Sequence, residues 1–126
     1  SSVALEGAKI VPAFDRDKVV RSLAEGLPVI VWRRVSLERE KVHRQFATAR
    51  RTNPSLAPPP LTPEELAKLS ERDGRGLPSH ASVVTGYSPA TDSVVYAEPW
   101  GEDTRDRRMR VEEMEATAYA VVFFKL

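Results

Sequence analysis

Two side chains in this sequence have types and positions that suit acid–base chemistry. His80 starts one apolar run that is typical of a strand, and Glu98 closes the next such run. In an antiparallel hairpin, the numbers of the two residues in each pair have a constant sum. If that sum is even and near 180, His80 and Glu98 lie on the same face of the sheet, within a residue or two of each other across the two strands. A carboxylate that contacts one imidazole nitrogen fixes the tautomer and stabilises the imidazolium, so that the other nitrogen can deprotonate a nucleophile. Histidine and glutamate are also common at strand ends without any catalytic role, so spacing alone leaves both interpretations open.

Cysteine is absent from the 126 residues. Its absence excludes disulfides, thiolate metal sites and a cysteine nucleophile within this chain. The two histidines, His43 and His80, are too few for a histidine-built metal site, and we predict neither a metal nor any other cofactor. The 19 basic and 18 acidic residues give a net charge of +1, which provides no field that would attract nucleic acid. No apolar run approaches the length of a membrane span, so none is predicted.

The pattern of expected strands and helices that must position His80 and Glu98 predicts an α+β fold with an antiparallel sheet of about four strands. Strands are expected near residues 28–33, 80–87, 93–98 and 118–125, and helices near 16–25, 37–51 and 63–72. The length fits a single domain spanning residues 1–126. Within it, residues 36–78 read as a helical insertion whose two helices are separated by a proline-rich hinge.

Several segments carry more specific expectations. Residues 6–14 contain a proline and read as an extended lead-in or, at most, an edge strand. Residues 27–32 are continuously apolar, which is typical of a strand buried on both faces. Residues 36–51 predict a basic helix with a weak apolar face, whose charges are either solvated or bound to an acidic partner. Residues 101–108 read as a charged loop and residues 112–117 as one helical turn.

Three segments together resemble a known family. The run HASVVTGY (His80–Tyr87), followed by VVYAEPWG (Val94–Gly101), is similar to the block around the catalytic histidine of papain-like cysteine peptidases. The similarity is to the bacteriocin-processing, double-glycine leader type and its C39-like relatives. Gly26–Val31 resembles their helix-to-strand step, and Met109–Met114 resembles the segment before their last strand.

The resemblance implies the sheet lobe of a papain-like fold and a role for each residue of the site. His80 would be the general base, Glu98 would hold the position of the orienting aspartate or asparagine, and Trp100 would line the cleft that binds a peptide or protein substrate. No counterpart of the family's glutamine and Cys-Gly-Pro segment precedes Asp15. The nucleophile is therefore expected from a segment that is not in this chain, such as one upstream. Without that half one face of the sheet could be left uncovered, so a partner chain or a homo-oligomer is expected to cover it. The family resemblance alone favours an extracytoplasmic location.

Three hypotheses remain open on the sequence. The chain is the C-terminal, histidine-bearing half of a cysteine peptidase, or it is a non-catalytic relative whose cleft binds a peptide or protein. The absent cysteine and the extra methylene of Glu98 favour the non-catalytic hypothesis. The third hypothesis is an unrelated binding domain that shares only the hairpin pattern. Whether the domain is an enzyme does not follow from the sequence.

Overall fold

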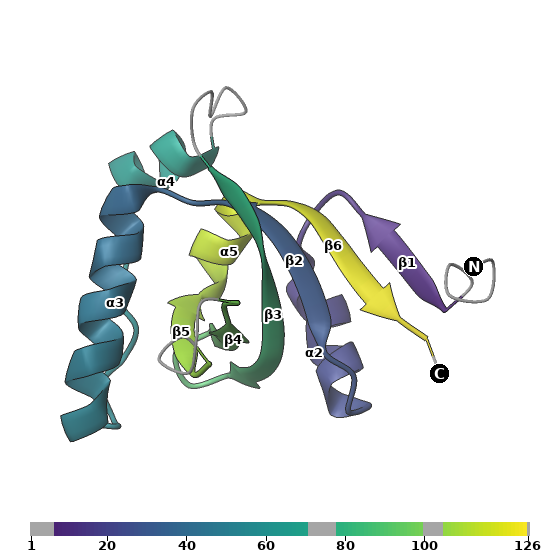
Figure 1. Ribbon diagram of the computed structural model, residues 1–126, viewed down its shortest axis with the longest axis horizontal. Coiled ribbons are helices and arrows are strands. Elements are labelled where there is room, and N and C mark those ends of the chain that lie inside the picture. Colours follow the sequence, from purple (N-terminus) through teal and green to yellow (C-terminus); the bar gives the residue numbers. More distant parts are fainter. Residues whose placement is uncertain (1–6, 71–77, 100–104, 126) are drawn as a thin grey trace.

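The strands form one antiparallel sheet. The computed structural model describes residues 7–70, 78–99 and 105–125, and six strands lie within them in the order β1-β6-β2-β3-β4-β5 (Figure 1). The strands are β1 (Ala8–Val11), β2 (Val29–Arg34), β3 (Ser79–Ser88), β4 (Ser93–Ala97), β5 (Arg107–Arg110) and β6 (Ala118–Phe124). The α+β class is confirmed, and the described part of the chain has six strands where about four were expected.

Helices α2 (Arg16–Ala24), α3 (Leu37–Thr52), α4 (Pro63–Ser70) and α5 (Val111–Thr117) complete the described elements. Local chemistry explains where they begin and end. The Asp15 carboxylate accepts hydrogen bonds from the first backbone amides of α2, and Gly26 ends that helix in the left-handed region, with φ 80°. At α4, Thr62 and Glu65 cap each other reciprocally, each side chain accepting from the other residue's backbone amide at 3.1 Å.

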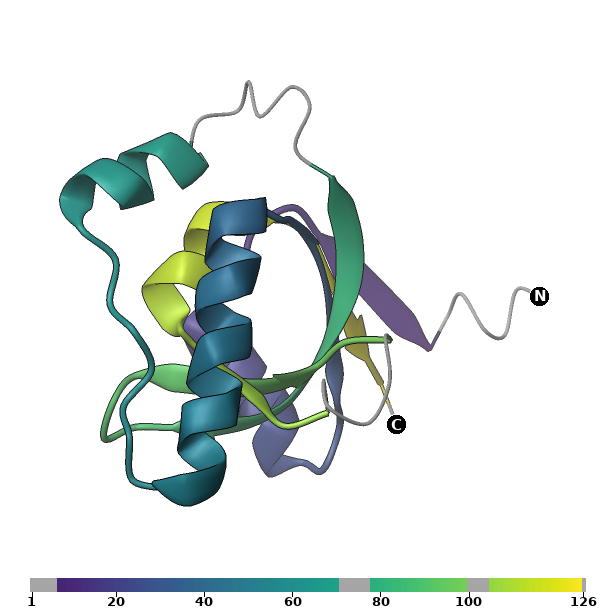
Figure 2. The ribbon, with the colours of Figure 1, turned by 60° about the vertical axis from the view of Figure 1, so that its left-hand side comes forward.

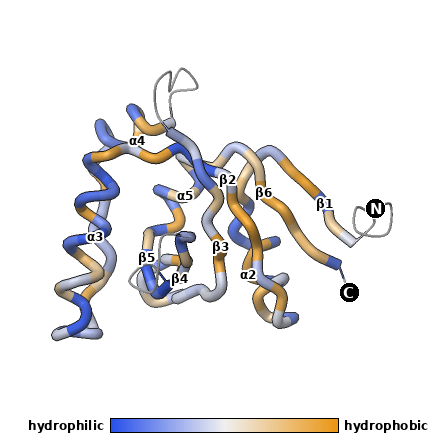
Figure 3. Tube along the Cα trace, viewed as in Figure 1, coloured by the Kyte–Doolittle hydropathy of each residue, from blue (hydrophilic) through white to orange (hydrophobic). Residues whose placement is uncertain are grey.

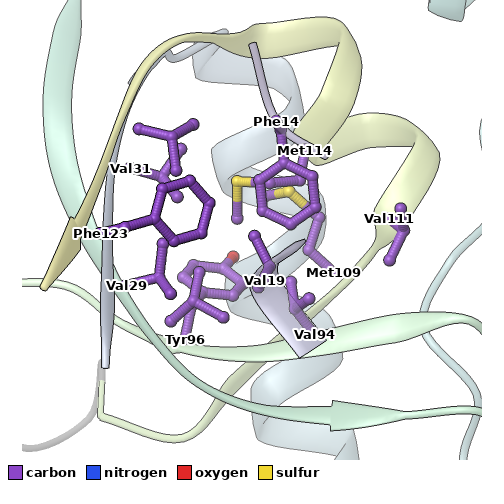
Figure 4. Packing of buried hydrophobic residues seen from close by; sticks show 12 residues of the cluster. Phe14, Val19, Val29, Val31, Val94, Tyr96, Met109, Val111, Met114 and Phe123 are labelled. Carbon is purple, nitrogen blue, oxygen red and sulfur yellow. The ribbon is translucent and has the colours of Figure 1, made fainter. Parts of the chain in front are cut away.

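The core lies between the sheet and helices α2 and α5 (Figure 4). Figure 3 shows hydrophobic residues running along β2 and β6, whereas α3 is largely hydrophilic. The fully buried side chains of this cluster come from seven elements: Val19, Val29, Val31, Val84, Val94, Tyr96, Met109, Val111, Met114 and Val121. Within the described ranges, no helix is long and apolar enough to cross a membrane.

Strand β2 is buried on one face only, which corrects the prediction from its apolar run. Val29 and Val31 face the core, whereas Trp32 points to the other face and is 42% exposed. The strand also continues through Arg34, so that Arg33 falls on its buried face. The physical reason is that the helices pack against one side of the sheet, which leaves the alternate residues of β2 partly exposed.

The two edges of the sheet were predicted unequally well. Strand β1 pairs only with β6, as expected for an edge strand at residues 6–14. At the other edge, β5 includes Arg107 and Arg108, which the sequence placed in a charged loop. That prediction is wrong because Arg107 is buried in an ion pair with Glu40 of α3, which allows a basic segment to join the sheet.

Helix α3 also differs from its prediction. Its expected apolar face includes Leu37, which is exposed, and the residues it buries are instead Arg39, Glu40 and His43. Figure 2 shows α3 passing beside α5, and the helix also reaches the sheet directly, where Glu40 pairs with Arg107 of β5. The helix is therefore attached through buried charges rather than through an apolar stripe.

Candidate functional site

The register of β3 and β4 brings His80 and Glu98 together. Val83 pairs with Ala97, so the residue numbers sum to 180 at this end of the hairpin. This is the condition under which His80 and Glu98 share a face. A bulge near Gly86 shifts the register by one at the other end, next to the turn, and leaves the His80 end unaffected.

Glu98 lies directly after β4, and its side chain is fully buried. Its Oε2 lies 2.7 Å from Nε2 of His80, within ion-pair distance. The His80 side chain is 15% exposed. The site thus combines a rigidly enclosed carboxylate with an imidazole that still reaches the surface.

The other oxygen of Glu98 is held by Arg33 and Ser82. Oε1 accepts from the Ser82 hydroxyl at 2.7 Å and from NH2 of Arg33. The Arg33 Nε donates to the Ser82 oxygen at 2.8 Å, which closes a ring of hydrogen bonds among the three side chains. All three are buried, and Arg33 lies directly opposite His80 across β2 and β3.

Ser82 is not placed to act as a nucleophile. A serine triad needs the histidine between the hydroxyl and the carboxylate. Here Ser82 contacts Glu98 on the oxygen that faces away from His80, and its hydroxyl is fully buried. Any nucleophile that His80 serves must come from a different residue.

A second histidine–glutamate pair provides an internal comparison. His43 Nε2 lies 2.8 Å from Oε2 of Glu113, and Arg39 donates to both oxygens of the same carboxylate. Burial alone would raise the pKa of Glu113, but the hydrogen bonds from His43 and Arg39 outweigh it and hold the pKa below its ordinary value. The ionised carboxylate can only accept, so His43 donates through Nε2. Because the His43 side chain is only 2% exposed, this pair fits a structural role.

Tyr96 lies between the two histidine–glutamate pairs. The Arg33 guanidinium carbon is 5.2 Å from the centre of its ring, and the His43 ring meets it edge-on at 6.4 Å. Burial raises the pKa of Tyr96 well above its ordinary value, so the phenol stays neutral. The uncharged tyrosine ring thus contacts a residue of each cluster, Arg33 in one and His43 in the other.

Comparison with known proteins identifies a family for this chain. A family model described as "Peptidase_C39 like family" matches residues 4–123. The chain belongs to the Peptidase_C39-like family. No curated protein and no solved structure matches it significantly. Family membership confirms the peptidase-like resemblance, and the matched range also includes residues 36–78.

The other candidate features of this Peptidase_C39-like chain are Trp100, a possible metal site and the surface hollows. Trp100, expected to line the cleft, lies outside the described residues. Within the described residues no group of three or more His, Cys, Asp or Glu side chains could hold a metal ion. A surface hollow of about 260 Å³ lies between α2 and strands β1 and β6, and one of about 320 Å³ lies between α4 and α5. Neither is lined by His80 or Glu98.

Sequence reasoning missed Arg33 and Ser82, although a signal for both was present. Each lies two residues from a buried valine, Val31 or Val84, and side chains two residues apart in a strand share a face. A polar residue on a buried face requires a partner, and Glu98 is the residue that satisfies both.

Proposed function

We propose that this chain supplies the histidine–carboxylate half of a cysteine-peptidase site, with His80 as general base and Glu98 as its orienting carboxylate. The nucleophilic cysteine would come from a segment outside these 126 residues. The observation that carries the proposal is the 2.7 Å contact between Nε2 of His80 and the fully buried Oε2 of Glu98. Membership of a peptidase-like family supports it.

In this proposal each nitrogen of His80 has its own role. Because Nε2 faces Glu98, Nδ1 is the atom that would take the proton from the thiol. The thiolate sulfur then bonds to the peptide carbonyl carbon, and the C–N bond breaks as His80 returns the proton to the leaving amine. Water hydrolyses the resulting thioester and restores the thiol. The proposed substrate is a peptide or protein, and Trp100 is the proposed contact for it.

The test uses the complete gene product that carries this chain, incubated with a mixture of short peptides and followed by mass spectrometry. His80→Ala should reduce cleavage by about 10²–10⁴-fold, the usual contribution of a general base. His43→Asn is the matched control, since it changes a histidine with the same type of partner in a buried position. It should lower stability and leave cleavage per folded molecule unchanged. A complete product that cleaves peptides equally well without His80 would disprove the assignment.

One observation favours a second candidate function, a non-catalytic domain that binds peptides. The buried guanidinium of Arg33 already balances the charge of Glu98, which leaves less of that charge to stabilise an imidazolium. If this reading holds, the complete product binds peptides without cleaving them, and His80→Ala leaves the affinity unchanged. Binding measured by fluorescence anisotropy, alongside the cleavage assay, separates the two functions.

A further inference from the structure

We infer that Arg33 and Ser82 are positioning residues, which hold Glu98 so that it fixes the tautomer of His80. The inference rests on the proposed function of His80 as a base, and it assigns how the base is prepared. Both residues contact Oε1 of Glu98, so the carboxylate is held by the oxygen that His80 does not use.

Glutamate makes such a support necessary. It has one more rotatable bond than aspartate, so a glutamate in this position has more ways to turn away from the histidine. The hydrogen-bond ring removes that freedom, because rotating Glu98 would break its bonds to Ser82 and to Arg33 together. The ring thus offsets the added methylene of Glu98.

Arg33 is itself fixed from two directions. Its guanidinium lies over the ring of Tyr96, which is fully buried in the core, and its backbone is paired with His80 across the sheet. Tyr96 therefore holds the Arg33 guanidinium in place, and the guanidinium holds the Glu98 carboxylate. The carboxylate in turn orients the His80 imidazole. A lysine at position 33 could keep the charge but could not donate from two nitrogens in this fixed geometry.

The consequence for His80 is a defined hydrogen position. A carboxylate facing Nε2 favours the neutral tautomer that carries its hydrogen on Nε2 and leaves Nδ1 as the acceptor. This tautomer is the one that a base acting through Nδ1 requires. Loss of Arg33 or Ser82 should let Glu98 reorient and the two tautomers mix.

The tautomer can be measured directly on this chain by NMR, with ¹⁵N-labelled histidine and His80→Ala to assign the ring signals. In the unaltered chain, Nε2 of His80 should resonate as a protonated nitrogen and Nδ1 as an unprotonated one. In Ser82→Ala and Arg33→Lys the preference should fall by about ten-fold, the usual scale of a hydrogen bond to a charged group. Arg34→Met is the matched control, because Arg34 is the adjacent arginine and its guanidinium lies instead over Tyr119.

The His43 signals report whether each variant is folded, since that ring is buried in a separate cluster. If Arg33→Lys does not fold, Ser82→Ala alone decides, because it removes one hydroxyl and nearly preserves volume. A folded Ser82→Ala with the ring shifts of the unaltered chain would overturn the inference. This outcome is distinct from failure of the proposed function, which shows as cleavage that survives His80→Ala. In the complete product, Ser82→Ala should lower kcat per folded molecule and leave KM unchanged.

Discussion

Glu113 is the side chain whose replacement should destabilise this fold most clearly. Its carboxylate on α5 accepts hydrogen bonds from Arg39 and His43 of α3. Arg39 also lies 3.7 Å from Glu65 of α4. Glu113→Gln keeps the shape and removes the charge, so the buried Arg39 loses the carboxylate to which it donates two hydrogen bonds and keeps the longer contact with the partly exposed Glu65. Breaking a buried pair in this way costs about 3–5 kcal/mol. For a domain of this length the loss corresponds to about 10–20 °C in Tm.

Equilibrium urea denaturation and thermal melting at neutral pH measure the effect. Glu112→Gln is the matched control, because Glu112 is the preceding residue of the same helix and is exposed. Its effect should stay within about 0.5 kcal/mol. Combining Glu113→Gln with Arg39→Met should recover part of the loss, since the pair then disappears as a unit. If the two glutamine variants have equal stability, Glu113 does not anchor the helices.

Acid gives an independent measure of the same carboxylate. Because the pKa of Glu113 in the folded protein is held below its ordinary value of 4.5, its stabilising effect is complete above that value. The effect is lost as the pH falls through the lower, folded-state pKa. The free energy of unfolding should therefore decrease more steeply below about pH 4.5 in the unaltered chain than in Glu113→Gln. Parallel acid profiles would refute the assigned direction of the pKa shift.

Four further substitutions probe the core and the ends of α2 through the midpoint of urea unfolding. Met114→Ala should lower the free energy of unfolding by about 2–5 kcal/mol because the side chain is fully buried. Ile10→Ala, at a site 69% exposed, should lower it by less than about 0.5 kcal/mol. Similar losses at both sites would contradict the placement of the core. Gly26→Ala should cost about 1–2 kcal/mol through backbone strain alone, since φ is 80° and no atom lies within 4 Å of an added Cβ, and an unchanged midpoint would argue against the left-handed turn. Asp15→Ala should cost about 1 kcal/mol by removing the cap of α2, and a neutral effect would show that the amides are satisfied otherwise.

The hairpin that carries His80 and Glu98 could be predicted because its signals are local. Apolar and β-branched runs on each side of a turn specify two strands, and alternation in a strand specifies which side chains share a face. The helix caps at Asp15 and Thr62 could be predicted for the same reason, since each acts within three residues.

The buried charges could not be predicted in this way. Glu98 follows Arg33 by 65 residues, and Glu113 follows Arg39 by 74, so no local pattern links the partners. From the sequence alone, Arg33 indicates the end of a strand and Arg39 indicates a helix that is exposed to solvent. The identity of β5 was hidden by the same effect, because Arg107 becomes compatible with a buried strand position only once Glu40 lies beside it.

The closed ring of Arg33, Ser82 and Glu98 also restricts how these positions can change during evolution. Each residue satisfies the other two, so a single replacement leaves buried polar groups unmatched, whereas exchanging the whole set for apolar residues need not be costly. The three positions should therefore vary together among relatives. Arginine, serine and glutamate found together at these positions in a relative would indicate that the buried ring is inherited as a unit.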